Sequence, residues 1–155
     1  LYEAVQADGS LYEISEENAD AFVRAVLKEK GNYYAFKIEQ NFGINTQKDK
    51  VAIIASIRDQ LELLKLMKIQ GNDFEISNAQ IVIWFKKWST QFNYRIVGVG
   101  IDFIQADILS DPPNYLELAK QVYSMCPDVV DQGTETVENL AKEMKEGKTM
   151  YFWWD

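Results

Sequence analysis

Apolar residues recur along this chain of 155 residues with two different periods. Between Ser15 and Gly31 they lie three and four residues apart, which predicts an amphipathic helix. Between Tyr34 and Ile38 large apolar residues occupy every second position, which predicts a strand with one buried face. Because such segments alternate along the chain, we expect an α+β fold, with a mixed β-sheet of about four or five strands covered by helices in a single compact domain.

The same patterns predict the remaining elements. Ser56 with Asp59, and Ser77 with Gln80, have the spacing of a capping box, in which two side chains satisfy free amides at a helix start. The other predicted strands are a buried strand over 51–55, a long strand over 94–103 and a closing strand over 150–154. In the long strand, Val97, Val99, Ile101 and Phe103 are expected on one face, and Gly98 and Gly100 on the other. Two further helices are predicted, one opened by Asp111, Pro112 and Pro113 and a last one capped by Gly133 or Thr134.

The chain is strongly acidic, with a formal net charge of -8 at pH 7. Such a charge repels nucleic-acid phosphates unless a basic patch overcomes it, and the basic stretches around Lys48 and Lys86 are too short for that role. We therefore expect no nucleic-acid partner. A protein partner, and a basic one in particular, is more compatible with this charge.

Histidine is absent, which removes the commonest general base and the imidazole ligands of metals. Any chemistry would rest on carboxylates, lysines, tyrosines or the one thiol. That thiol, Cys126, cannot form an internal disulfide or a thiolate metal cluster by itself. We accordingly expect no cofactor and no metal.

The sequence also bears on location. No apolar run approaches the roughly 20 residues that cross a bilayer, so we expect no membrane span. A single cysteine fits a reducing compartment, and a cytoplasmic protein is therefore expected. Because the chain starts without methionine, a processed and exported form is the alternative.

One segment near the C-terminus is unusually dense in hydrogen-bonding side chains. Residues 126–134 read Cys-Pro-Asp-Val-Val-Asp-Gln-Gly-Thr, and the chain ends in two tryptophans and an aspartate. If this loop folds back beside the closing strand, the two stretches form one cluster. The candidate binding or structural residues are Cys126, Pro127, Asp128, Asp131, Gln132, Gly133, Thr134, Trp153, Trp154 and Asp155.

These motifs carry a family resemblance. The Cys-Pro-Asp and Asp-Gln-Gly runs between two helices, followed by Trp-Trp-Asp, resemble the bacterial family known as domain of unknown function 4253. The resemblance covers roughly residues 30 to 155. It implies one domain over 1–155, in which a family-like core over 31–155 follows an N-terminal helical extension over 1–30. The label of the family implies no activity.

The polar residues of the loop have two interpretations each. Asp128 and Asp131 could form a carboxylate pair for a divalent cation or for acid-base chemistry, since hard cations prefer several oxygen ligands. Alternatively, both aspartates satisfy backbone amides, one in a turn and one at the start of the last helix. Cys126 is expected to be a buried structural thiol, because a helix C-terminus disfavours a thiolate.

Three functional hypotheses follow. The first is a non-catalytic binding or interaction module, immunity-like or regulator-like, which suits the size, the charge and the missing histidine. The second is a carboxylate-based, metal-assisted hydrolase that uses Asp128, Asp131 and Asp155. The third is a structural role, in which a buried polar network holds the last helix on the closing strand and Asp131→Ala lowers stability by a few kcal/mol. We favour the binding module.

Overall fold

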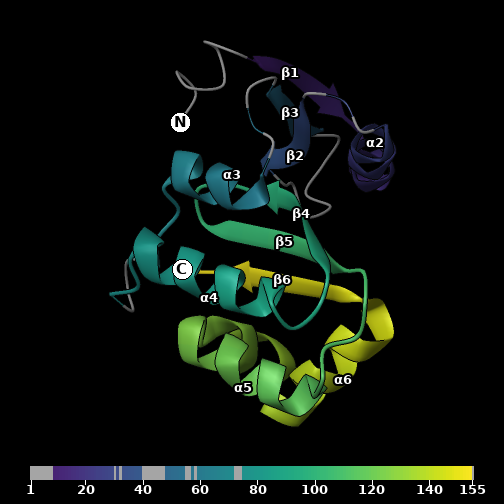
Figure 1. The fold of residues 1–155 in the computed structure, drawn as a ribbon. Helices are drawn as coiled ribbons and strands as arrows, with labels where there is room; N and C mark the ends of the chain where they lie inside the picture. Colours follow the sequence, from purple (N-terminus) through teal and green to yellow (C-terminus); the bar gives the residue numbers. More distant parts are fainter. Residues whose placement is uncertain are drawn as a thin grey trace.

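The computed structural model describes residues 9–29, 31, 33–39, 48–54, 57, 59–71 and 75–154. Six strands form one sheet in the order β1-β3-β2-β4-β5-β6 (Figure 1). β2 and β4 run parallel and the other neighbours run antiparallel. The elements are β1 (Gly9–Ile14), α2 (Glu16–Lys28), β2 (Tyr34–Glu39), β3 (Asp49–Ile54), α3 (Gln60–Met67), α4 (Asn78–Ser89), β4 (Tyr94–Val99), β5 (Phe103–Ile108), α5 (Tyr115–Met125), the π-helix η2 (Val129–Thr134), α6 (Val137–Gly147) and β6 (Thr149–Trp153).

The predicted α+β class, mixed sheet and single compact domain are confirmed, although the sheet has six strands rather than four or five. The sequence does not predict β1, because its side chains are almost all exposed and lack the alternation that marks a half-buried strand. It also does not predict β5 as a separate strand. Among the described helices, none has the length and apolar composition that a bilayer crossing requires.

The long strand predicted over 94–103 is wrong, because this segment is the start of a hairpin. β4 ends at Val99 and β5 begins at Phe103. Between them the Gly100 amide donates to the Phe103 carbonyl oxygen at 2.9 Å, which closes a tight turn. A Cβ atom at Gly100 would lie 2.2 Å from the Phe103 ring, so this close approach requires a glycine.

The predicted faces of that strand are also wrong. A bulge between Ile96 and Gly98 changes the register, so that Val97 packs under α2 while Val99 belongs to the core on the opposite face. Ile101 is in the turn and is 79% exposed. Sequence alternation does not reveal the bulge, because the extra residue is itself apolar.

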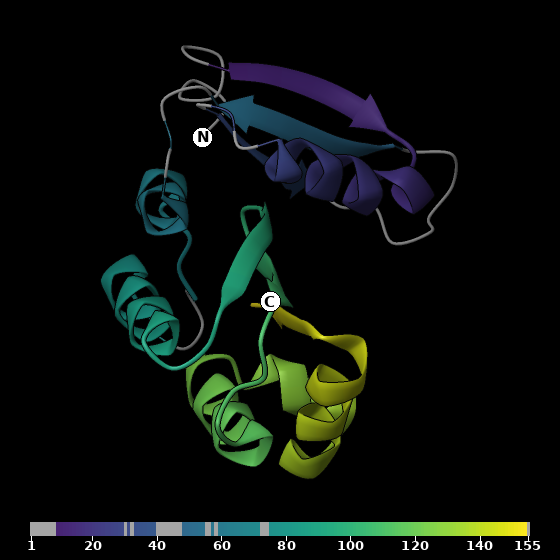
Figure 2. The ribbon, with the colours of Figure 1, turned by 45° about the vertical axis from the view of Figure 1, so that its right-hand side comes forward.

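Helices cover the two faces of the sheet unequally. Among the described helices, α2 covers one face, whereas α3 to α6 contribute to the larger core on the other (Figures 1 and 2). That larger core has an aromatic centre, in which the Trp88 ring lies 5.1 Å from Phe85 and 6.0 Å from Phe152, centroid to centroid. The smaller cluster under α2 consists of Ala19, Val23, Ala35, Val51 and Val97.

Several helices begin or end at residues other than those predicted. The capping box of Ser77 and Gln80 is present at the start of α4. α3 starts after Asp59, whose Oδ1 accepts from the Leu61 amide at 2.8 Å, and Ser56 lies outside the described residues. α2 ends at Lys28, before Gly31.

The last two helices begin later than predicted. Asn114, rather than Asp111, caps α5, because its Oδ1 accepts from both the Leu116 and Glu117 amides. Thr136, rather than Gly133 or Thr134, caps α6, since those two residues belong to η2.

β2 and β4 form a short parallel seam that joins two three-stranded halves of the sheet. Among the described residues one bridge pair, Lys37 with Gly98, joins these strands. Beyond it the side chain of Gln60 bonds to β4 as a strand would. Its Oε1 accepts from the Ile96 amide at 2.9 Å, and its Nε2 donates to the Tyr94 carbonyl oxygen at 3.2 Å.

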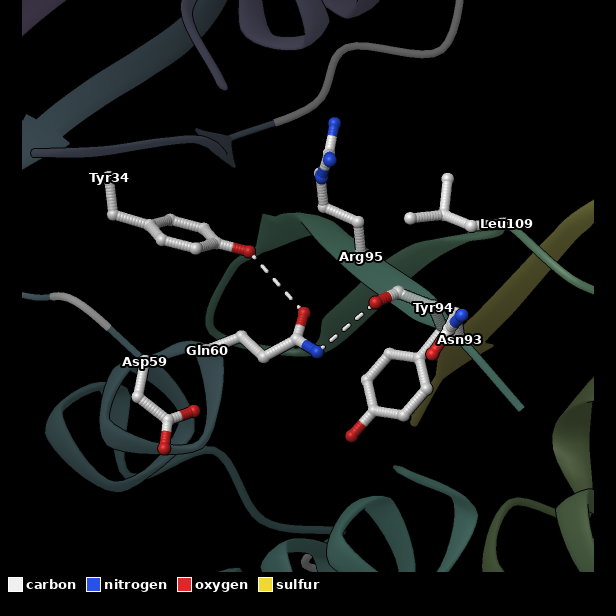
Figure 3. Close-up of a pocket in the computed structure, with 7 residues that line it drawn as sticks. All are labelled: Tyr34, Asp59, Gln60, Asn93, Tyr94, Arg95 and Leu109. Carbon is white, nitrogen blue, oxygen red and sulfur yellow. Dashed lines mark hydrogen bonds between the residues drawn. The ribbon is translucent and has the colours of Figure 1, made fainter. Parts of the chain in front are cut away.

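Tyr34 completes this connection from the β2 side. Its hydroxyl donates to the Ile96 carbonyl oxygen at 2.7 Å, and burial raises the pKa of the hydroxyl. Figure 3 shows the Tyr34 hydroxyl and the Gln60 amide directed toward each other across the seam. Side chains rather than a continuous ladder therefore hold this part of the sheet together.

Gln60→Ala tests this connection. The substitution leaves the buried Ile96 amide without its acceptor, and an unsatisfied buried donor costs about 1–3 kcal/mol. We expect the free energy of unfolding, measured by urea denaturation, to fall by about that amount. Gln91→Ala removes the same type of side chain from an exposed turn and should change the free energy of unfolding by less than about 0.5 kcal/mol. Equal effects of the two substitutions would show that Gln60 does not hold the seam.

Candidate functional site

The structure brings the predicted polar loop and the closing strand together. Cys126 follows α5 and donates from Sγ to the Trp153 carbonyl oxygen at 2.9 Å. The Trp154 indole Nε1 donates to the Met125 carbonyl oxygen at 3.1 Å. At Gly133 the Trp153 ring lies so close that a Cβ atom would be 2.8 Å from its Cη2. These contacts join the end of α5, η2 and β6 into one unit.

The loop itself is helical. The Pro127 carbonyl oxygen accepts from the Val130 and Asp131 amides at 3.0 and 2.9 Å as η2 begins. At the other end, the Thr134 hydroxyl donates to the Thr136 carbonyl oxygen at 3.0 Å. The predicted loop residues therefore connect α5 to α6 through backbone hydrogen bonds.

The two aspartates of this loop lie in different environments. Asp128 is 5% exposed and accepts from Gln132 Nε2 at 2.8 Å. Asp131 is exposed and accepts from the Tyr123 hydroxyl at 3.1 Å. Asp155, the third carboxylate of the hydrolase hypothesis, lies outside the described residues. In the described part of the chain, no three or more Cys, Asp or Glu side chains are grouped to hold a metal ion.

Cys126 acts as a hydrogen-bond donor in this structure. Burial raises the pKa of its thiol to about 12, although backbone hydrogen bonds oppose that rise. A neutral thiol can donate to the Trp153 carbonyl oxygen, whereas a thiolate cannot. The environment therefore suits a structural thiol rather than a nucleophile.

A hollow of about 400 Å³ lies beside this unit, between η2, α6 and β6. The rings of Tyr151 and Trp153 form part of its wall, and Glu143 is its charged lining residue. It offers apolar contact area with few polar groups to orient a ligand.

A second pocket, of about 440 Å³, opens at the seam (Figure 3). We call it the seam pocket. Its walls come from β2, the start of α3, and the adjacent ends of β4 and β5, and the residues that line it are Tyr34, Asp59, Gln60, Asn93, Tyr94, Arg95 and Leu109. It forms where β2 and β4 are joined by side chains instead of by ladder bonds.

Arg95 is the cationic group of the seam pocket. Asp107 lies directly opposite it in the β4–β5 ladder. Both carboxylate oxygens of Asp107 are bound by Arg24 of α2, with Nε–Oδ2 at 2.7 Å and Nη2–Oδ1 at 2.9 Å. Within the described residues, the Arg95 side chain consequently has no hydrogen bond and no ion pair.

Asn93 comes immediately before β4 and lines the seam pocket together with Arg95. The Asn93 side chain likewise makes no hydrogen bond to any residue that the structure describes. Figure 3 shows the Arg95 guanidinium pointing away from the Tyr94 ring. The seam pocket thus presents donors that bond to none of the described residues.

Buried charges lie next to Arg24 on the α2 face. Lys37 is 3% exposed, and its Nζ lies 2.6 Å from Asp20 Oδ1. Gln105 Nε2 donates to Asp20 Oδ2 at 3.3 Å. Burial is the largest influence and raises the pKa of Asp20, but the hydrogen bonds from Lys37 and Gln105 and the charges of Lys37 and Arg24 together hold that pKa below its usual value. These pairs attach α2 to the sheet.

Sequence analysis does not identify the seam pocket. Its residues come from four separate segments, and none of them forms a recognisable motif. The pairing of Arg24 with Asp107 joins residues 83 positions apart. Only the hairpin register and the position of α2 reveal that Arg95 lacks its cross-strand partner.

Comparisons with known proteins were consistent with the resemblance noted above. The profile of a family described as "Domain of unknown function (DUF4253)" matches residues 50–155. At the significance required, no curated protein and no solved structure matches the chain.

Alanine substitutions should separate the two aspartates of the loop. Asp128→Ala removes a buried hydrogen-bonded carboxylate and should lower the free energy of unfolding by about 1–3 kcal/mol. Asp131→Ala alters an exposed side chain and should change the free energy of unfolding by less than about 0.5 kcal/mol. Urea denaturation measures both. The structure therefore moves the stability loss from Asp131, where the sequence placed it, to Asp128, and the reverse order would contradict this assignment.

The buried thiol should make stability depend on pH. Above the ordinary thiol pKa of about 8.5 the unfolded chain loses this proton, while the native chain keeps it until the raised pKa of Cys126 is reached. Stability should therefore fall as pH rises. Between pH 8.5 and 9.5 we expect the wild type to lose about 1 kcal/mol more than Cys126→Ala in urea denaturation. Parallel pH profiles would show that the thiol titrates normally.

Proposed function

The chain belongs to the DUF4253 family, and we propose that this member is a non-catalytic module that binds another protein. That partner protein inserts one of its groups into the seam pocket. The observation that carries this proposal is the Arg95 guanidinium. Arg24 binds the Asp107 carboxylate that lies opposite Arg95, so Arg95 lines the pocket without an ion pair among the described residues. A half-buried cation that has no hydrogen bond or ion pair among the described residues is a candidate for binding a ligand.

The proton-transfer groups of the seam pocket favour binding over catalysis. Asp59 caps α3. The hydroxyls of Tyr34 and Tyr94 donate to the Ile96 and Phe85 carbonyl oxygens at 2.7 and 2.6 Å, and burial raises the pKa of both. These groups serve the fold, so a general acid or base is not available among them. The groups left over, Arg95 and Asn93, bind rather than transfer protons.

A protein partner suits this surface. The pocket volume of about 440 Å³ lies toward the lower end of the range for ligand sites, and it can take one or two side chains. Leu109, on the rim, is 52% exposed and offers apolar contact. The net charge of -8 favours a basic partner, as an immunity-like or regulator-like protein would have. A cytoplasmic location is part of this proposal.

The hydrolase alternative has weaker support. It requires Asp128 and Asp131 to converge, but one is buried against Gln132 and the other is exposed beside Tyr123. We therefore do not propose a reaction for this loop.

Two tryptophan substitutions test the proposed binding site. Leu109→Trp places a large ring at the rim of the seam pocket, whereas Ile101→Trp places the same ring at the far end of β5. We expect protein partners captured from the native lysate by the wild type to be retained by Ile101→Trp. Leu109→Trp should reduce capture about tenfold or more, which corresponds to about 1.4 kcal/mol.

Quantitative mass spectrometry of the captured proteins gives the measurement, and thermal unfolding checks that both variants are folded. Capture alone does not support the proposal. A partner that binds all three proteins equally would contradict the assignment of the seam pocket.

A further inference from the structure

We propose that the group bound in the seam pocket is a carboxylate, held by Arg95 and Asn93. This inference rests on the proposed function and adds the chemistry of the recognised group. It follows from how charges are paired on the α2 side of the sheet and from the shape of the donor.

Two cations on the α2 side of the sheet have carboxylate partners, and among the described residues Arg95 has none. Lys37 pairs with Asp20, and Arg24 pairs with Asp107. The Arg24–Asp107 pair uses the bidentate arrangement in which two N–H groups meet two carboxylate oxygens, the strongest form of this pairing. Arg95 faces the same aspartate across the ladder but finds its oxygens engaged. A carboxylate from a ligand could pair with Arg95 in the way that the Asp107 carboxylate pairs with Arg24.

The donors fit a planar anion. A guanidinium presents a flat fork of N–H groups that matches the two oxygens of a carboxylate. Asn93, which also lines the pocket, adds an amide donor. Arg95 is half-buried, so its charge is partly shielded from water, and a charge-assisted bond to it is stronger than one at an open surface.

The surroundings favour a monoanion over phosphate. Asp59 also lines the pocket, and the whole chain carries a net charge of -8. Repulsion from these charges grows with the charge of the ligand, so it acts more strongly on a phosphate dianion than on a carboxylate. One arginine offsets one negative charge.

This arrangement would also give specificity. A basic partner is attracted by the acidic surface as a whole, but attraction of that kind does not fix its orientation. A single carboxylate on the partner that meets the Arg95 guanidinium would set the register. Partners with a lysine at that place would be rejected by like charge.

The first experiment titrates the ¹⁵N-labelled chain with sodium propionate, propionamide or inorganic phosphate at constant ionic strength. The Arg95 Nε–H and Asn93 amide signals report binding. We expect propionate to give saturable shifts at both groups, with propionamide and phosphate each about tenfold weaker or more. Absence of saturable shifts at Arg95, or tighter binding of phosphate, would overturn the carboxylate assignment.

Arg95→Gln and Lys65→Gln form a matched pair. Both remove one positive charge, but Lys65 is an exposed residue of α3 outside the pocket. Arg95→Gln should weaken propionate binding about tenfold or more, and Lys65→Gln should leave it within about twofold. Because Arg95 makes no bond to the described residues, both variants should fold, as thermal unfolding will check. Equal propionate affinity in the two variants would refute the role of Arg95.

Peptides distinguish the source of the carboxylate. One amidated lysine-rich peptide carries a central glutamate, a second carries glutamine there and a free C-terminus, and a third carries glutamine and an amidated end. Either of the first two should shift Arg95, and the one that binds more tightly identifies a side-chain or terminal carboxylate. Equal binding of the third would refute the inference.

The inference and the proposed function fail in different ways. If Leu109→Trp leaves partner capture unchanged while propionate still shifts Arg95, the protein-binding proposal is wrong. If Leu109→Trp abolishes capture but propionate does not bind, the carboxylate assignment is wrong.

Discussion

The side chain of Gln60 is the interaction on which the arrangement of this sheet depends. An amide side chain carries one acceptor and donors at a spacing close to that of backbone groups, so it can take the place of a neighbouring strand. Here it satisfies the Ile96 amide and the Tyr94 carbonyl oxygen of β4 where β2 has diverged. The two halves of the sheet stay joined, and the space that a strand would have filled becomes the seam pocket.

A second interaction links stability to the proposed binding. Arg24 attaches α2 to the sheet through Asp107, and the same contact denies Asp107 to Arg95. The position of α2 thus decides whether Asp107 can pair with Arg95. Arg24 and Tyr34 lie before the region that the family profile covers, whereas Arg95 and Asp107 lie within it. The pocket as described combines both parts of the chain.

In the structure, the polar C-terminal motif makes its hydrogen bonds within the fold. The Cys126 thiol and the Trp154 indole donate to backbone carbonyl oxygens, and Asp128 accepts from Gln132. A segment rich in hydrogen-bonding residues can therefore serve to join α5, η2, α6 and β6. Density of polar residues in a sequence indicates a network, but it does not distinguish a binding network from a structural one.

The sequence by itself determined the local elements, because periodicity and capping depend on residues close together in the chain. The α+β class, the β2 strand and the capping box at Ser77 follow from such patterns. The sequence also indicated that the loop at Cys126 and the strand at Trp153 could form one cluster. Tertiary structure decided the rest: the turn at Gly100, the bulge that separates Val97 from Val99, and the pairing of Arg24 with Asp107. The bulge and the ion pair depend on residues that meet only after the sheet has assembled, and local patterns do not encode which of several partners a charged side chain will find.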